Sequence, residues 1–386
     1  MTSKQPERTA HPRAAPKRAA LSGVAFIIVA GAVLYVTGYS DLFAVRYERE
    51  AYAKQSASTT PRASLDIGAY NRKMLSLAHV STTTALIPES AVASTTPKGT
   101  AVYSATTSVS VLGRKWPTPT VYPNTGALFP YDRIVAYYGN FYSKQMGVLG
   151  EYPPDVVLEK LRAAVAEWEA ADPSTPVIPA IDYIAVTAQG SPGADGKYRY
   201  EMPDSQIDHA IELANEVHGV VFLDVQVGLS NLKAELPPLA KYLSMPNVYL
   251  AIDPEFSMKY GNPPGTVIGT FDASDINYAA NYLAFLAAQH GLPPRILVVH
   301  RFTYDMVTNY EKIRPLPNVE IVMDMDGWGT PEKKYGTYTN VIAPEPVQFT
   351  GFKLFYKNDV KPPSTHMLTP PEVLKLTPAP SFIQYQ

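Results

Sequence analysis

The stretch YLAIDPEFSM, residues 249–258, is apolar over its first four positions and then places Asp253 and Glu255 on either side of a proline. A short apolar run of this kind is typical of a strand that is buried on both faces. Carboxylates directly after such a strand serve either chemistry or local structure, because acids also cap helices and accept from loop N–H groups. The choice depends on what the other strands carry at the same end.

Seven further apolar or β-branched runs share this character and alternate with segments of helical pattern. They lie at residues 133–140, 176–186, 219–228, 295–302, 319–327, 351–359 and 381–386, and the run quoted above belongs to a strand at 248–256. The helical patterns between them occupy residues 153–172, 203–219, 231–243, 274–291, 303–315, 331–343 and 369–376. Eight parallel strands that alternate with helices predict an α/β fold, a closed (β/α)8 TIM barrel over residues 131–386. The alternative is an open doubly wound sheet, but YYGNFYSKQMG after the first strand is not a Gly-rich phosphate loop.

The first forty residues have the pattern of a membrane anchor. The segment 1–20 contains the basic residues Lys4, Arg8, Arg13, Lys17 and Arg18. Residues 21–40, LSGVAFIIVAGAVLYVTGYS, carry no charge. This length matches a bilayer core, whereas the apolar part of a cleaved signal peptide is usually about 7 to 15 residues. The sequence therefore predicts a single transmembrane helix, a signal anchor at 21–40. A long cleaved signal is the alternative.

The distribution of charge around residues 21–40 predicts the orientation of the chain. Basic residues precede the apolar segment, and the flank after it mixes acidic and basic residues. By the positive-inside rule, residues 1–20 form a cytoplasmic tail and the remainder of the chain lies outside the membrane. Residues 41–130 are rich in Ser, Thr and Pro, which predicts an extended, disordered stalk with short helices near 44–54 and 66–78.

Composition excludes several classes of function. The formal net charge is -2, so the chain lacks the basic excess of a nucleic-acid-binding protein, and we expect no nucleic acid partner. The sequence contains no cysteine, which excludes disulfides, thiolate metal ligands and a cysteine nucleophile. No sequence pattern predicts a cofactor.

The predicted strands carry acids near their carboxyl ends, where TIM barrels place their reactive groups. The catalytic candidates are Glu255, Asp253, Asp224, Asp324 and Asp326. Residues two apart on a strand share a face, so Asp253 with Glu255 and Asp324 with Asp326 are expected to converge inside the barrel. Clustered carboxyl groups raise one another's pKa, and a protonated acid beside a carboxylate is the pair that glycoside hydrolysis uses.

Further polar and aromatic side chains near the same strand ends are candidates for substrate binding. They are Tyr138, Asn140, Asp182, Gln226, His300, Trp328, Lys353 and Tyr356. The chain has 26 tyrosines, and flat rings with a polar edge suit the faces of sugar rings. A single tyrosine equally well fills a barrel mouth, and a lone histidine after a buried strand is more often a hydrogen-bonded core residue than a base.

Two alternatives accompany the glycan hydrolase interpretation. A divalent cation bound by Asp224, Asp253 and Asp324 would give a metal-dependent hydrolase of phosphoesters or acyl groups. A barrel that binds polysaccharide or another envelope component without cleaving it would keep the cleft and lack the chemistry. Asp272 and Asp275 are interpreted as caps of the helix near 275–290 and are not catalytic candidates.

Long phrases between residues 134 and 386 carry a family resemblance. They include VAYYGN, MGVLGEYPPD, FLDVQVG, LAIDPEFSM, IGTFDASDINYA, VVHRFTYDMVTNYEKI and MDMDGWG. The chain resembles exported bacterial proteins that are expected to be glycoside-hydrolase-like TIM barrels. More distantly, Asp253 and Glu255, with Asp324 or Asp326, are similar to the Asp-x-Glu and later Asp of lysozyme-like muramidase barrels. Those enzymes place an aspartate on the first strand, where this chain has Tyr138 and Asn140.

Overall fold

The computed structural model describes residues 65–80 and 115–386. The chain divides into two units, Met1–Ser58 and Thr59–Gln386, and every described residue belongs to the second unit. The predicted membrane span at 21–40 and most of the predicted stalk lie outside the described residues. Within the described ranges, no helix has both the length and the apolar character that crossing a bilayer requires.

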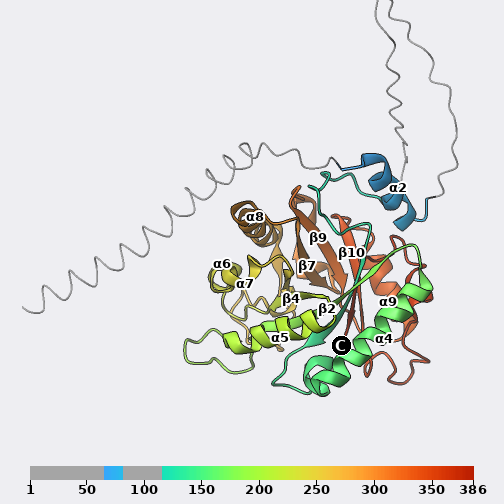
Figure 1. Ribbon diagram of the computed structural model, residues 1–386. Helices are drawn as coiled ribbons and strands as arrows, with labels where there is room; N and C mark the ends of the chain where they lie inside the picture. The colour runs from blue at the N-terminus through green and yellow to red at the C-terminus, as the bar shows by residue number, and fades with distance from the viewer. Residues whose placement is uncertain (1–64, 81–114) are drawn as a thin grey trace, which may run out of the picture. The chain divides into compact units, whose positions relative to one another are not determined.

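Eight parallel strands close into a barrel (Figure 1). They are β1 (Arg133–Gly139), β2 (Val177–Ala188), β4 (Val220–Val225), β5 (Val248–Ile252), β7 (Arg295–Arg301), β9 (Val319–Met325), β10 (Phe349–Leu354) and β11 (Phe382–Tyr385). Each pairs with its two neighbours, and β1 closes the ring by pairing with both β2 and β11. The predicted (β/α)8 barrel is therefore confirmed.

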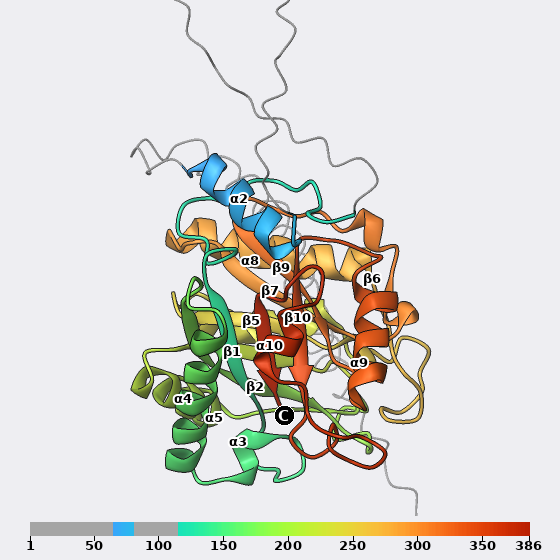
Figure 2. The same ribbon diagram turned by 90° about the vertical axis from the view of Figure 1, so that its right-hand side faces the viewer.

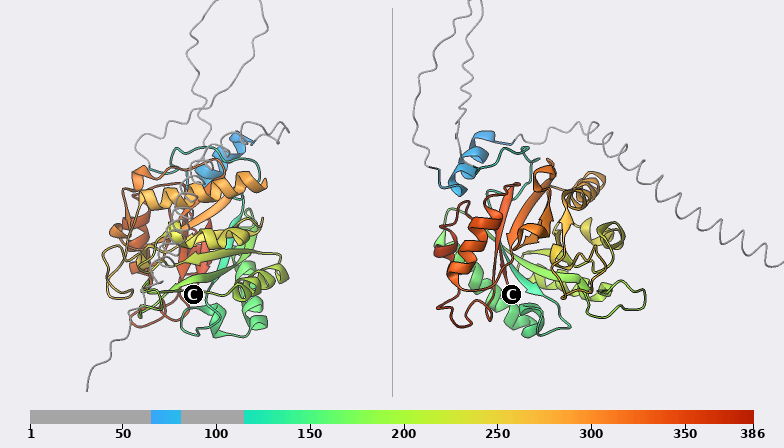
Figure 3. Two further views of the ribbon diagram at one scale, coloured as in Figure 1. Left: turned by 90° about the vertical axis from the view of Figure 1, so that its left-hand side faces the viewer. Right: turned by 180° about the vertical axis from the view of Figure 1, so that it is seen from behind.

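Helices lie outside the barrel, where Figures 1 and 3 show them around the strands. They are α3 (Val148–Glu151), α4 (Pro154–Ala171), α5 (Asp204–Glu216), α6 (Leu232–Glu235), α7 (Ala240–Leu243), α8 (Ala273–His290), α9 (Pro331–Thr337) and α10 (Pro370–Val373). A short 3-10 helix at Pro237–Leu239 separates α6 from α7, because Pro237 and Pro238 interrupt the expected helix at 231–243. A π-helix at Tyr338–Ile342 extends α9. The predicted cap of the helix near 275–290 is present, since Asp272 and Asp275 form a capping box at the start of α8.

The helix predicted at 303–315 is wrong. This segment forms two 3-10 turns, η3 (Tyr304–Met306) and η4 (Tyr310–Lys312), with the short strand β8 (Val307–Thr308) between them. Asn309 has a φ of 57°, which a right-handed helix does not permit. The Arg301 side chain donates to the carbonyl oxygens of Thr303 and Tyr304, so it replaces helical N–H groups as their partner. Two other short strands, β3 (Arg199–Glu201) and β6 (Phe271–Asp272), were likewise not predicted.

Alternate residues of the strands build two separate apolar layers. On β4, Phe222 joins the cluster inside the barrel, whereas Leu223 joins the cluster between the barrel and its helices. This alternation follows from the two-residue period of a strand. Because the interior is filled by apolar side chains, polar groups are left to the ends of the strands.

One end of the barrel is closed by segments that precede β1. The helix α2 (Ile67–Leu77), in the range expected to be short and helical, places Tyr70 and Met74 against the interior cluster (Figure 2). Phe129 joins the same cluster, and the Glu320 carboxyl accepts from the backbone N–H groups of Leu128 and Phe129. Burial raises the pKa of Glu320 to about 8. These contacts close the amino ends of the strands.

We expect deletion of residues 381–386 to abolish cooperative folding. The deletion removes β11, which pairs with both β1 and β10, and so leaves two unpaired strand edges and an open barrel. Thermal unfolding followed by circular dichroism and calorimetry measures the effect, with deletion of Gln386 alone as the control. A soluble 381–386 deletion that still melts cooperatively would contradict a barrel that depends on this strand.

Candidate functional site

Each of the eight parallel strands contributes one buried polar side chain at the carboxyl end of the barrel. The eight residues, called here the polar ring, are Tyr138, Asp182, Asp224, Asp253, His300, Asp324, Lys353 and Gln384. Asp253 directly follows β5, and the other seven lie within their strands. The polar ring therefore collects polar residues far apart in the sequence at one end of the barrel.

The layer beneath the polar ring explains its position. Two residues before each member stands a small or apolar residue: Ala136, Ala180, Phe222, Ala251, Val298, Val322, Gly351 and Phe382. Seven of these residues belong to the interior cluster, and the eighth is Gly351. A Cβ atom at Gly351 would lie 2.4 Å from Oδ1 of Asp324, so only glycine leaves room for that carboxylate. The apolar layer supports the ring from below and separates it from the closed end.

His300 contacts three carboxylates, two from the ring and one from the loop after β9. Its Nε2 lies 3.1 Å from Oδ2 of Asp224, and its Nδ1 lies 3.1 Å from Oδ2 of Asp324 and 3.5 Å from Oδ2 of Asp326. Burial acts to lower the pKa of His300, but these carboxylates outweigh it and hold the pKa well above its usual value. His300 is therefore an imidazolium whose two N–H groups both donate to carboxylates.

Lys353 supplies a second buried cation. Its Nζ lies 3.0 Å from Oδ1 of Asp326 and 3.8 Å from the centre of the Tyr138 ring. Burial acts to lower the pKa of Lys353, and Asp326 and Asp324 raise it above its usual value. Asp326 consequently contacts two cations, one through each oxygen.

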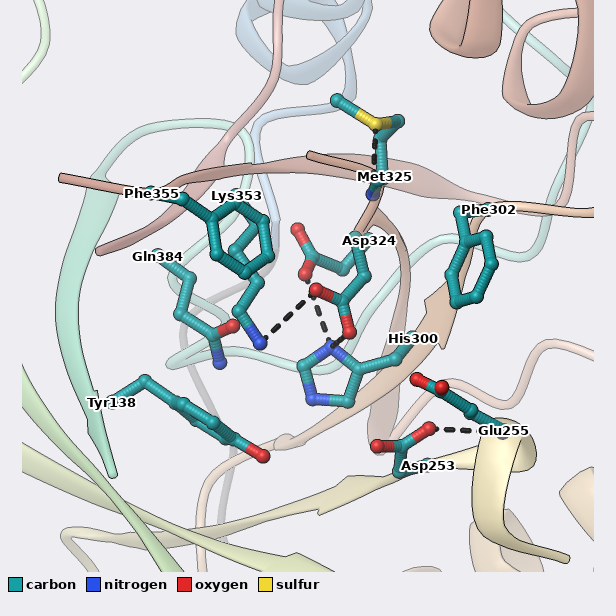
Figure 4. A network of polar contacts seen from close by, with 12 residues as sticks. Tyr138, Asp253, Glu255, His300, Phe302, Asp324, Met325, Lys353, Phe355 and Gln384 are labelled. Atoms are coloured by element: carbon teal, nitrogen blue, oxygen red, sulfur yellow. Dashed lines mark hydrogen bonds and ion pairs between the residues drawn. The ribbon is translucent and has the colours of Figure 1, made fainter. Parts of the chain in front are cut away.

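Glu255 differs from the other acids of the site in its exposure. It lies in the 3-10 turn η2 (Pro254–Phe256), which Asp253 caps by accepting from the Glu255 N–H at 2.9 Å. Figure 4 shows Asp253 and Glu255 next to His300, opposite Tyr138, Lys353 and Gln384. Glu255 is partly exposed, and burial together with the charge of Asp326 raises its pKa to about 7. A large fraction of Glu255 is thus protonated near neutral pH.

Asp253 and Glu255 were expected to lie on one strand, but this turn places them beyond the strand end. The sequence predicts a strand through residue 256, whereas β5 ends at Ile252. Pro254 lacks an N–H group for the sheet, and the Asp253 side chain starts the turn instead. Likewise β4 ends at Val225 and β9 at Met325, so Gln226 and Asp326 lie just beyond their strands. The acids therefore meet through loop geometry as well as through the two-residue period.

Asp182 and Asp253 are ring members whose pKa values are raised. Burial and the neighbouring Asp224 raise the pKa of Asp182 to about 8, and Gln384 Nε2 donates to its Oδ2 at 2.5 Å. Burial also raises the pKa of Asp253 well above its usual value. Among the described residues, Oδ1 of Asp182, Asp224 and Asp324 has no protein partner. Protonated acids and unpartnered oxygens give the ring hydrogen-bonding capacity that the protein itself does not use.

Four of the residues predicted to bind substrate lie outside the ring. Gln226 donates to Tyr138 Oη at 3.1 Å, so it supports a ring member from behind. Asn140 donates to the carbonyl oxygen of Ile184 and accepts from the N–H of Tyr142, which uses its amide for loop structure. Tyr356 contacts Tyr137 and Tyr385 in the layer outside the strands. Trp328 lies on the loop after β9 and is 49% exposed.

Gln384 is the ring member absent from the predicted site residues. Its only signal in the sequence is its position two residues after an apolar Phe382 in the last strand. Within residues 65–80 and 115–386, no three His, Asp or Glu side chains are arranged to hold a metal ion.

No family model and no curated protein matches the sequence. Solved structures with a distant likeness include a GH5-4 broad specificity endoglucanase from an uncultured bovine rumen ciliate, at 11% identity and TM-score 0.30 over 53% of this chain and 72% of that chain. A ruminal GH26 endo-beta-1,4-mannanase has 12% identity and TM-score 0.32 over 66% and 59% of the two chains. A GH18 chitinase from Pseudoalteromonas aurantia has 11% identity and TM-score 0.29 over 66% and 93%. None of the three is a muramidase, and TM-scores this low do not assign an activity.

Proposed function

We propose that the polar ring and Glu255 form the active site of a glycoside hydrolase. The observation that carries this proposal is the pair of acids Glu255 and Asp326 at the carboxyl end of the barrel. Glu255 has a pKa of about 7, and Asp326 contacts the cations Lys353 and His300. Glycosidic bond cleavage needs one carboxyl group that donates a proton and a second carboxyl group that acts as nucleophile or base.

In this mechanism Glu255 is the general acid. It is partly exposed, so a substrate can reach it, and it donates its proton to the glycosidic oxygen as the bond to the anomeric carbon breaks. Asp326 provides negative charge at the anomeric carbon, either as the nucleophile or as the base that activates water. Asp326 suits this role better than Asp224 or Asp324, because those two are fully buried whereas Asp326 is 8% exposed.

The other ring members position these two groups. Lys353 and His300 fix the Asp326 carboxylate from two sides, and Tyr138 lies under the Lys353 ammonium. Asp253 fixes the turn that carries Glu255. Side chains held by packing and hydrogen bonds reach the transition state without reorganisation, which is what electrostatic catalysis requires.

The proposed location is outside the cytoplasmic membrane. If residues 21–40 act as a signal anchor, the barrel is exported, and glycans of the cell envelope or the surroundings are the substrates within its reach. An acid pair, and no cofactor, then performs the reaction.

The test is incubation of the purified full-length protein with peptidoglycan and a panel of soluble polysaccharides, followed by quantification of new reducing ends. Release from at least one glycan, unaffected by a chelator, supports the proposal. Activity that is lost with chelator and restored by a divalent cation would support the metal-dependent alternative instead. Binding without release from any glycan would make the barrel a recognition module.

We expect kcat/KM for the cleaved glycan to fall as the pH rises through about 7. Glu255 must hold its proton to act as the acid, and its pKa is raised from the usual glutamate range to about 7, so the protonated fraction is lost in that interval. Initial rates at low substrate across the pH range measure this limb. A profile that already falls near pH ~5, where an unperturbed glutamate ionises, would contradict the assignment.

A further inference from the structure

Trp328 is an exposed aromatic side chain at the rim of the proposed active site. It follows Asp326 by two residues, on the loop that leaves β9 at the carboxyl end of the barrel. Nearly half of its surface is accessible, at 49%. An exposed indole beside a polar site is suited to pack against the C–H face of a sugar ring.

The loop that carries Trp328 is held by a buried ion pair. Asp359 Oδ1 accepts from the N–H of Gly329 at 3.0 Å, and Asp359 Oδ2 pairs with Lys334 Nζ at 2.8 Å. Lys334 Nζ also donates to the carbonyl oxygens of Gly327 and Lys353. Asp359 and Lys334 are both almost fully buried. The rim loop is therefore fixed to the same backbone that positions Lys353 in the polar ring.

Two lysines flank the indole. Lys333 Nζ lies 4.9 Å and Lys361 Nζ 5.8 Å from the centre of the Trp328 ring. Gly329 permits the close approach of Lys333, since a Cβ atom there would lie 2.6 Å from Lys333 Cδ and its φ is 147°. The structure thus builds a cluster of one indole and two ammonium groups, called here the rim cluster.

The charge of the rim cluster is not neutralised by the described part of the chain. Some other exposed lysines pair with carboxylates, as Lys357 does with Glu151 and Lys259 with Asp275. Among the described residues, no carboxylate forms an ion pair with Lys333 or Lys361. Two unpaired cations beside the acids of the proposed active site favour a ligand that carries negative charge at the rim only.

We propose that the rim cluster is a subsite for a negatively charged sugar residue, which makes the substrate an anionic polysaccharide. This inference rests on the proposed glycoside hydrolase function and adds the substrate class. The indole packs against the sugar ring, and the two ammonium groups pair with its carboxylate or sulfate. The charged residue binds at the rim and not over Glu255 and Asp326, where the carboxylate of Asp326 would repel it.

The experiment compares charged polysaccharides with neutral partners of the same backbone. Polygalacturonate and hyaluronan are tested beside their carboxyl-reduced forms, and dextran sulfate beside dextran, using the full-length protein at low salt. We expect at least one charged polymer to bind about tenfold more tightly than its neutral partner. The reason is that ion pairs with Lys333 and Lys361 add to the packing of the sugar ring on Trp328. The advantage is expected to shrink at high salt. If the charged polymer that binds more tightly carries carboxylates, the subsite recognises a carboxylate; if it is dextran sulfate, the subsite recognises a sulfate.

Variants assign the preference to the rim cluster. The double variant Lys333→Gln and Lys361→Gln is expected to abolish the preference for charge and to leave binding of neutral polymer unchanged. Trp328→Ala is expected to weaken binding of both forms about tenfold. Lys357→Gln is the matched control, since Lys357 lies on the same loop as Lys361 but already pairs with Glu151. Equal melting temperatures verify that each variant is folded.

The failure of this inference differs from the failure of the proposed function. Equal affinity for charged and neutral polymers, no binding to any charged polymer, or a charge preference that survives the double variant would overturn the anionic subsite. Cleavage of a neutral glycan that depends on Glu255 would leave the proposed hydrolase intact in that case. Conversely, a preference for charged polymers without any cleavage would retain the subsite and overturn the hydrolase.

Discussion

Replacing Glu255 by glutamine is expected to lower kcat/KM for glycan cleavage by about 10³-fold while leaving substrate affinity nearly unchanged. Glutamine keeps the size and polarity of the side chain but cannot donate a proton to the leaving oxygen. The Glu255 N–H still donates to Asp253, so the turn that carries the residue is retained. Cleavage rates and binding isotherms of the two proteins on the same glycan measure both quantities.

Two controls separate loss of the acid from loss of structure. Glu311→Gln changes an exposed glutamate on η4 and is expected to leave the rate unchanged. An aryl glycoside with an acidic phenol as leaving group needs little protonation, so Glu255→Gln is expected to lose far less activity on it than on a natural glycan. An equal loss on both substrates would show that Glu255 does not act as the general acid.

Replacing His300 by glutamine is expected to destabilise the fold by about 3–5 kcal/mol, because it leaves the buried carboxylates of Asp224 and Asp324 without their cation. The pKa of His300 is raised well above its usual value in the folded protein. Its stabilising contribution is therefore complete below about pH 6.5 and disappears as the pH rises through the folded pKa. The stability difference between wild type and variant is thus expected to narrow at alkaline pH.

Denaturant unfolding at several pH values measures this difference. The control is His290→Gln, an exposed histidine at the end of α8, for which a change within about 0.5 kcal/mol is expected. A His300→Gln protein as stable as wild type at pH ~6 would show that the imidazolium does not hold the ring together.

The barrel could be predicted from the sequence because its strands are near-continuous apolar runs. Every predicted strand start lies within two residues of the observed one, as for residues 133 and 295, which begin β1 and β7. The strand ends were harder to predict where one residue changes the local hydrogen bonding. Pro254 ends β5 early, and the Arg301 side chain together with Asn309 replaces the expected helix at 303–315.

The residues at the centre of the site were candidates from the sequence, but the contacts between them could not be predicted. His300 was a candidate for substrate binding, and its partners Asp224 and Asp324 lie 76 and 24 residues away in the sequence. That convergence depends on the register of the barrel, in which His300 stands opposite Asp324 on the adjacent strands β7 and β9. Glu255 keeps its proton in part because Asp326 is close to it. The two-residue period of the strands does not predict that these two side chains come close together.

The helix α2 makes the barrel accessible from one side only. Tyr70 and Met74 fill the amino end, and Lys73 fastens the helix to the Ser174 carbonyl oxygen at 3.0 Å. A polymer therefore cannot thread through the molecule and must lie across its face. The described chain begins at residue 65, beside the end of the barrel that α2 covers and opposite the polar ring.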